Sequence, residues 1–236
     1  MFDRSAYVYD LIYDAVKDYR AEADALVGLI QEMNPGASSL LDVACGTGRH
    51  LELLRSAFPD IAGIDLEPTM LEIARGRLPD AFVEIGDMRT FDLGRTFDVV
   101  TCLFSSIGYM ATVAELDAAL ARMAAHLAPG GLLVVDGWVK AEAWLPGVNV
   151  HAIANSDDET AVARVSRTQR DGDRTHLEMR YLIATADGFT ETAEHHTLTL
   201  FDDAAYTAAF RSAGLEPKKI AGPMGEDRDR YVAVAP

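Results

Sequence analysis

The chain has 236 residues, of which 49% are hydrophobic, and this composition excludes a disordered or fibrous protein. Its formal net charge of −16 argues against binding to nucleic acid or an anionic membrane, since such binding depends on clustered Lys and Arg. No apolar run approaches the roughly 20 residues of a membrane-spanning helix, and the start MFDRSAYVYD lacks the features of a signal peptide. We therefore expect a cytoplasmic protein whose partner is a small molecule.

The two cysteines, Cys45 and Cys102, both lie in apolar segments, where a reduced cysteine behaves as a small buried hydrophobic residue. They are too few and too isolated for a metal site or a disulfide framework, and we predict neither. Residues 1–236 are predicted to form a single domain, and the sequence leaves open whether the protein is a homodimer.

The amino-terminal part is predicted to be helical. Apolar residues recur at helical spacing over residues 21–33, after a tyrosine-rich segment that contains Tyr7, Tyr9, Tyr13 and Tyr19. We expect residues 1–36 to form a helical lid that caps the sheet described next.

From residue 40 onward, short β-branched runs alternate with amphipathic stretches, as in a parallel sheet joined by crossover helices. The strands are predicted at residues 40–44, 61–65, 81–85, 97–104 and 131–137. Three further strands, at residues 160–168, 174–184 and 190–201, predict an antiparallel lobe inserted over the active site within residues 138–201. A helix at residues 202–213, a strand after Gly214 and a strand at residues 230–235 follow. This pattern predicts an α/β fold with helices on both faces of the sheet and a small antiparallel β insert.

The segment LLDVACGTGRH at residues 40–50 carries the clearest sign of a ligand site. Gly46 and Gly48 stand where the first strand turns into a helix, and glycine there permits positive φ and close approach of a ligand to the backbone. Asp65 ends the second strand seventeen positions after Gly48, where a carboxylate can accept hydrogen bonds from both hydroxyls of a ribose.

Dinucleotide dehydrogenases share this geometry, but their G-x-G-x-x-G pattern needs a small residue where this chain has Leu51. Asp42 suits a cationic amino acid moiety better than a diphosphate. Asp87 follows the third strand, where it can accept a hydrogen bond from an adenine amino group, and Met88 offers its backbone beside it. The pattern favours S-adenosylmethionine, a sulfonium nucleoside without phosphate.

These motifs resemble the class I methyltransferase family over essentially the whole chain. The resemblance implies a Rossmann-like seven-stranded sheet, mostly parallel with an antiparallel last strand, and S-adenosyl-L-methionine as cofactor. Tyr13 and Tyr19 of the lid are expected to close over that cofactor. The positions that match the family's cofactor pocket are Asp42, Ala44, Gly46, Gly48, Asp65, Leu66, Met70, Asp87, Met88 and Leu103.

Within that family the chain resembles the N,N-dimethyltransferases that act on dTDP-linked amino sugars, such as those of desosamine and mycaminose biosynthesis. The resemblance rests on GDMR at residues 86–89, TCLFSSIG at residues 101–108, HLAPGG at residues 126–131 and the late antiparallel insert. It implies direct in-line methylation of the amino group of a dTDP-linked amino-deoxy sugar in antibiotic biosynthesis.

The same resemblance places the acceptor near Ser105, Ser106 and Trp138. Enzymes of this kind carry a histidine directly after SSIG, whereas this chain has Tyr109, whose hydroxyl is a poor base at neutral pH. His195 on an inserted strand is a second candidate to receive the proton of the amine. A diphosphate needs local cations in so acidic a protein, and the candidates are Arg167, Arg180, Arg228 and Arg230.

Two other functions stay open at this point. One is N-, O- or C-methylation of a different small molecule. The other is a cofactor-binding scaffold without activity, whose mark would be a damaged pocket. All the pocket residues are present, which favours an enzyme.

Overall fold

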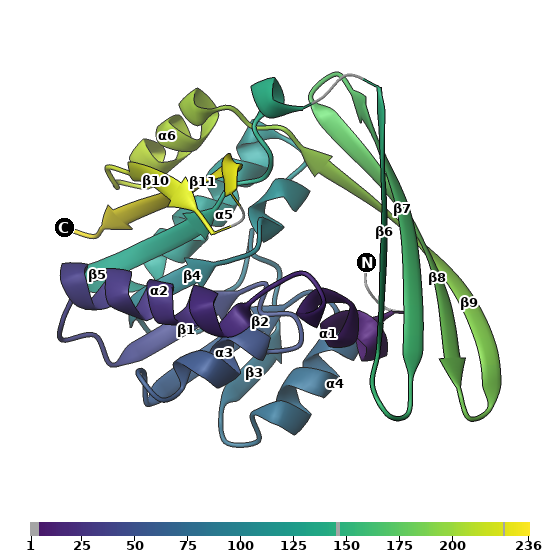
Figure 1. The fold of residues 1–236 in the computed structure, drawn as a ribbon. Coiled ribbons are helices and arrows are strands. Elements are labelled where there is room, and N and C mark those ends of the chain that lie inside the picture. The colour runs from purple at the N-terminus through teal and green to yellow at the C-terminus, as the bar shows by residue number, and fades with distance from the viewer. Residues whose placement is uncertain (1–4, 145–146, 224) are drawn as a thin grey trace.

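The computed structural model describes residues 5–144, 147–223 and 225–236. It contains a seven-stranded sheet with the order β10-β11-β5-β4-β1-β2-β3 and a separate four-stranded sheet with the order β6-β7-β8-β9. Figure 1 shows the four-stranded sheet to one side of the larger one, with the first helix between them. None of the described helices is long and apolar enough to span a membrane.

The larger sheet follows the predicted alternation of strands and helices. Neighbouring strands from β3 to β5 pair in parallel, and β11 pairs antiparallel with both β5 and β10. The prediction of a mostly parallel sheet with an antiparallel last strand is confirmed. Its strands are β1 (Ser39–Val43), β2 (Asp60–Asp65), β3 (Phe82–Ile85), β4 (Phe97–Cys102), β5 (Leu127–Asp136), β10 (Lys218–Gly222) and β11 (Gly225–Val234).

Helices cover both faces of this sheet, because alternate strand side chains point to opposite sides. On one face the core joins the sheet to α5 (Val113–Ala125) and α6 (Asp203–Ser212). On the other face it joins the sheet to α2 (Tyr19–Met33), α3 (Arg49–Leu54) and α4 (Pro68–Arg77). Capping side chains begin three of these helices, namely Asp18 for α2, Thr112 for α5 and Asp202 for α6.

The insert has four strands, so the prediction of three was wrong. They are β6 (Val148–Ser156), β7 (Ala161–Asp171), β8 (Arg174–Thr185) and β9 (Gly188–Thr199), and each pairs antiparallel with the next. The missed strand, β6, lies at an edge and has no fully buried side chain, so its sequence shows little apolar alternation.

The amino-terminal segment forms two helices with different neighbours. Val8 and Ile12 of α1 (Ala6–Asp14) pack against Val162, Met179 and Ile183 of the insert, whereas α2 packs on the larger sheet. Thus α1 lies between the two sheets (Figure 1), where it borders the cavities described below.

Candidate active site

The turn after β1 adopts backbone conformations that few residues tolerate. Its φ angles are positive at three positions, 63° at Ala44, 55° at Gly46 and 73° at Gly48. A Cβ on Gly48 would lie 3.1 Å from Leu78 Cδ1 and 3.2 Å from Ala74 Cβ, so space as well as φ requires glycine there. Gly48 is the capping residue of α3 and does not itself line a described cavity.

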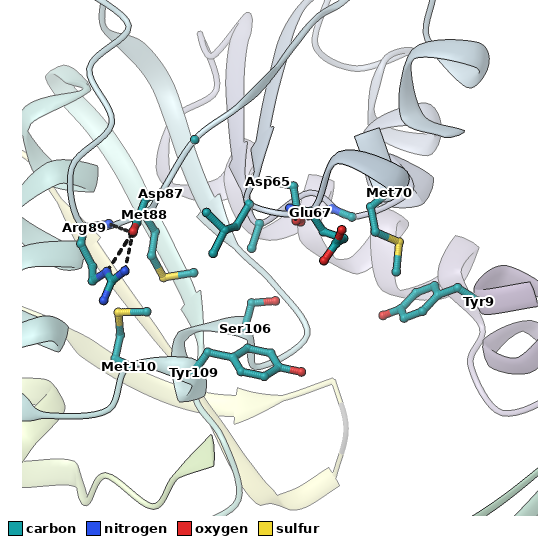
Figure 2. Close-up of a pocket in the computed structure, with 14 residues that line it drawn as sticks. Tyr9, Asp65, Glu67, Met70, Asp87, Met88, Arg89, Ser106, Tyr109 and Met110 are labelled. Atoms are coloured by element: carbon teal, nitrogen blue, oxygen red, sulfur yellow. Dashed lines mark hydrogen bonds and ion pairs between the residues drawn. The ribbon is translucent and has the colours of Figure 1, made fainter. Parts of the chain in front are cut away.

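A cavity of about 200 Å³ opens beside this turn, at the carboxyl edge of the larger sheet (Figure 2). Asp65 lies at its acidic side, where Oδ2 accepts the Gly46 N–H and Oδ1 accepts the Glu67 N–H, each over 2.8 Å. Burial raises the pKa of Asp65. The rest of the lining is largely apolar and includes Leu66, Met70, Met88, Met110 and Tyr9.

Asp87 stands across this cavity in a fixed orientation. Arg89 Nε donates to its Oδ1 over 2.9 Å and Arg89 Nη2 donates to its Oδ2 over 2.5 Å, as the dashed lines in Figure 2 show. Arg89 also donates to Glu115. The guanidinium lowers the pKa of Asp87, which therefore stays a hydrogen-bond acceptor at neutral pH.

A second cavity lies on the other side of the glycine turn and contains Asp42, Tyr19, His50 and Leu103 in its wall. Asp42 is buried, and its Oδ1 accepts the hydroxyl of Thr101 over 2.7 Å. Burial raises the pKa of Asp42 to about 7. A cation placed in this cavity would favour the ionised form of that carboxyl.

A third and larger cavity, of about 650 Å³, lies between the carboxyl edge of the larger sheet and the inward face of the insert. Its two arginines come from different elements, Arg164 from β7 and Arg228 from β11. The Arg228 guanidinium lies 4.4 Å from the ring centroid of Trp138 and donates to Ser105 Oγ over 3.5 Å. Arg164 is buried, and its Nε and Nη1 find no hydrogen-bond acceptor among the described residues.

The three cavities meet at a few side chains. Tyr9 and Ser106 line all three, and Tyr109 lines the first and the third. A molecule that fills the two smaller cavities therefore meets a molecule in the larger one beside these residues. Tyr9 belongs to the tyrosine-rich segment, but no spacing rule in the sequence distinguished it from its neighbours.

The floor at this junction is formed by strained backbone after β4. Phe104 and Ser105 have φ of 55° and 65°, a region that residues other than glycine adopt rarely. Asp136 holds this turn by accepting the Phe104 N–H over 3.1 Å, and Arg230 donates to Asp136 over 2.6 Å. Arg230, a predicted diphosphate ligand, is thus buried against a carboxylate and lines none of the described cavities.

Several predicted acceptor residues lie elsewhere. Arg167, Arg180 and His195 are exposed, because the strands of the insert place them on the face that points away from the cavity. Their inward neighbours are Arg164 on β7 and the buried His196 on β9. The assignment of these three to the acceptor site therefore disagrees with the structure.

Tyr13 lines a different cavity from the one expected from the sequence. It lines the large cavity and neither of the smaller ones, with its ring edge-on to Phe104 at a centroid distance of 5.1 Å. Tyr19, by contrast, lines the second cavity beside Asp42. The two tyrosines of the predicted lid therefore serve different cavities.

Comparison with known proteins agrees with this geometry. A family model described as a methyltransferase domain matches residues 40–131. The chain is 48% identical over 223 residues to the dTDP-3-amino-3,6-dideoxy-alpha-D-glucopyranose N,N-dimethyltransferase of Streptomyces fradiae, with 93% of this chain and 87% of that relative covered.

Solved structures give the same result. The crystal structure of Streptomyces venezuelae DesVI matches with a TM-score of 0.91 and 44% identity over 98% of each chain. The structure of SAM-bound CalS10, an amino pentose methyltransferase from Micromonospora echinaspora involved in calicheamicin biosynthesis, matches with a TM-score of 0.87 and 43% identity over 97% of each chain.

The sheet order, the glycine turn and the acidic residues after β2 and β3 define a class I S-adenosylmethionine-dependent methyltransferase. The residues present suit this cofactor. The buried carboxyl of Asp42 lines a cavity in which a cationic amino acid moiety would offset the cost of ionising that carboxyl. More narrowly, the chain belongs to the family of the dTDP-amino-sugar N,N-dimethyltransferases.

Proposed function

We propose that this enzyme methylates the amino group of a dTDP-linked amino-deoxy sugar in antibiotic sugar biosynthesis. The cofactor, when bound, supplies an electrophilic methyl group on a positively charged sulfur. A neutral amine forms a bond to the methyl carbon as the carbon–sulfur bond breaks, which leaves a neutral thioether. The observation that carries the acceptor assignment is the pair of arginines, Arg164 and Arg228, that line the large cavity of a protein with a net charge of −16.

On this proposal the two smaller cavities hold the cofactor. Asp65 and Glu67 bind the ribose, Asp87 and Met88 bind the adenine, and Asp42 faces the amino group of the methionine moiety. The apolar lining formed by Leu66, Met70 and Met110 suits an adenine ring, which makes few polar contacts with its faces.

The large cavity then holds the nucleotide sugar. Arg228 and Arg164 neutralise the diphosphate, because guanidinium groups bind phosphate oxygens and the Nε and Nη1 donors of buried Arg164 find no acceptor among the described residues. Trp138 offers a ring face beside Arg228 for the nucleotide base. The sugar lies toward Ser106 and Tyr109, where the cavities join.

We also propose that the amino-terminal residues 1–36 act as a lid and residues 138–201 as a lobe over the acceptor. The packing of α1 on β7 and β8 supports this division of the single domain. A cytoplasmic location is supported by the two described cysteines, which are both buried and free. Gel filtration with light scattering tests whether the enzyme is a homodimer, which the sequence leaves open.

Mass spectrometry of reactions with S-adenosylmethionine tests the acceptor. We expect one and then two added methyl groups on a dTDP-linked 3-amino- or 4-amino-deoxyhexose, and no product with the matching hydroxy sugar. Efficient methylation of an unlinked amine or of a hydroxyl compound, with none on the nucleotide sugars, would favour the alternative of a different small-molecule methyltransferase.

Calorimetry with dTDP tests the two arginines. Arg164→Gln and Arg228→Gln are each expected to weaken dTDP binding about tenfold or more, since a charge-assisted hydrogen bond contributes about 1.5–3 kcal/mol. Arg211→Gln is the matched control, because Arg211 pairs with Glu216 on the exposed surface of the molecule. Unchanged dTDP affinity in both cavity variants would contradict the assignment.

A further inference from the structure

A chain of three polar side chains leads from the junction of the cavities into the protein. The Tyr109 hydroxyl lies 2.9 Å from His196 Nδ1, and His196 Nε2 lies 3.6 Å from Glu194 Oε2. The side chains of His196 and Glu194 are 1% and 2% exposed, whereas Tyr109 lines two of the cavities. Neither of these two buried groups lines any of the three cavities.

The inner end of the chain is built to hold a carboxylate. Glu194 Oε1 accepts the Ser5 hydroxyl over 2.9 Å and the Ser5 N–H over 3.2 Å, and Oε2 accepts the Tyr181 hydroxyl over 3.3 Å. A separation of 3.6 Å is too long for a hydrogen bond but suits an ion pair with a charged imidazole. Glu194 is therefore placed to stabilise a proton on His196.

The other groups near this chain come from several elements. The pKa of the Tyr109 hydroxyl is influenced by nearby titratable groups. These are Tyr9 and Tyr13 of α1, Tyr181 of β8 and Asp65 at the end of β2. Arg164 of β7 is the cation of this group, and it interacts with Tyr13 and Tyr181. The neighbours of Tyr109 are thus mainly neutral hydroxyls, with Glu194 as the buried carboxylate beside His196.

We propose that Tyr109, His196 and Glu194 form a proton relay that deprotonates the acceptor amine before each methyl transfer. The N–H bond of the substrate ammonium breaks and its proton passes to the Tyr109 oxygen. The Tyr109 O–H bond breaks in the same step, and its proton forms a bond to His196 Nδ1. The amine keeps its electron pair, Glu194 pairs with the imidazolium, and the proton returns by the same path to water after product leaves.

The reaction requires removal of a proton from the acceptor, and Tyr109, His196 and Glu194 are arranged to receive it. This relay rests on the proposed amine acceptor. An aliphatic amine is mostly protonated at neutral pH and cannot attack a methyl group in that form. Two methylations would require this proton loss twice. Burial raises the pKa of Tyr109, so its hydroxyl stays intact and passes protons on without becoming a phenolate. His196 is a positioning and proton-holding residue that acts through Tyr109.

The pH dependence of the methylation rate separates this role from a structural one. Tyr109→Phe and His196→Gln are each expected to lower kcat/KM about 10²-fold at pH 7, within the usual range for acid–base catalysis. At pH 9.5, where the amine is increasingly neutral in solution, both variants should recover to within about tenfold of wild type. The double variant should lose no more than either single one, because both interrupt one path. His176→Gln, an exposed histidine on β8, is the matched control.

Nuclear magnetic resonance of the protein without ligands tests the relay independently of activity. Tyr109→Phe should move the His196 Nδ1 resonance to that of an imidazole nitrogen without a donor. Glu194→Gln should shift the ring resonances of His196, because the carboxylate 3.6 Å from its Nε2 is replaced by a neutral amide. His176→Gln should leave the His196 signals in place.

The outcomes separate the relay from the proposed function. An equal loss of kcat/KM at pH 7 and pH 9.5, or full activity of both variants at pH 7, would overturn the relay. A wild-type enzyme that methylates no nucleotide-linked amine would overturn the proposed function, whereas the resonance measurements would still report on the Tyr109–His196 bond. Unchanged His196 signals in both Tyr109→Phe and Glu194→Gln would overturn the relay on their own.

Discussion

Asp65 joins the turn after β1 to the end of β2, because its oxygens accept the N–H groups of Gly46 and Glu67. Asp65→Ala should weaken binding of S-adenosylhomocysteine about 10- to 100-fold, since the ligand and the turn lose a charged acceptor together. Isothermal titration calorimetry measures this. Asp60→Ala, at the exposed start of the same strand, is the matched control. Wild-type affinity of Asp65→Ala would rule out the ribose assignment.

Asp42 predicts an unusual pH dependence of stability. Its pKa of about 7 in the folded protein lies above the value of about 3.9 in an unfolded chain. The folded state therefore holds the proton more tightly, and this carboxyl's contribution to stability is present below pH 4 and lost as pH rises to 7. The loss follows a slope of at most about 1.4 kcal/mol per pH unit.

Asp42→Asn removes this effect while it keeps an oxygen for Thr101. In urea unfolding without ligand, the free energy of unfolding of the variant should rise relative to that of wild type between pH 4 and pH 8. S-adenosylhomocysteine should reverse the order, because its ammonium group favours the ionised Asp42 of wild type and finds a neutral amide in the variant. Parallel stability curves for the two proteins over this pH range would contradict the prediction.

At the scale of elements, the turn into α3 depends on glycine in a way that α4 does not. Gly48 has φ of 73° and a crowded Cβ position, whereas a Cβ on Gly76 of α4 would meet nothing within 4 Å. Gly48→Ala should lower the free energy of unfolding by about 1–3 kcal/mol. Gly76→Ala should raise it by about 0.5–1 kcal/mol, as expected for a helix. Urea denaturation measures both, and a stabilised Gly48→Ala would show that the turn relaxes.

The alternation of side chains along strands explains which residues sequence reasoning misplaced. On β9 the buried residues Glu194, His196 and Leu198 share one parity, which left His195 on the outer face. On β7 the same rule selects Arg164 over Arg167. The apolar residues alone did not reveal this parity, because Val162 of β7 is buried whereas Val165 is exposed, and Leu198 of β9 is buried whereas Phe189 is exposed.

β6 shows what the sequence could not supply. Edge strands obtain their order from pairing with a neighbour, and β6 pairs with β7 along Val148 to Ser156 without burying a side chain fully. The central strands β1, β2, β4 and β5 of the larger sheet were predictable because they are buried along most of their length and bounded by turns. The meeting of Tyr9 with Tyr109 was not, since it joins two distant segments through the packing of α1 on the insert.

At the scale of the whole molecule, the two sheets contribute unequally to the ligand cavities. The two smaller cavities lie at the carboxyl edge of the larger sheet, where motifs close in sequence converge, so most of the residues that line them stand in motifs recognised from the sequence. The large cavity combines residues from α1, β6, β7 and β11 that no local motif connects. Arg228 was among the arginines predicted from the sequence, whereas Arg164 was identified only by the tertiary arrangement.

The shared wall formed by Tyr9 has a thermodynamic consequence. A ligand that fixes the position of Tyr9 in one cavity also fixes this residue for the ligand in the other cavity. The affinities for the methyl donor and the acceptor should therefore be coupled by about 5- to 100-fold. Calorimetry in both orders of addition should give the same factor for S-adenosylhomocysteine and for dTDP. Tyr9→Ala should bring the factor toward one, and Tyr7→Ala, exposed on the same helix, should not. Such cooperativity makes each ligand control how long the other is retained.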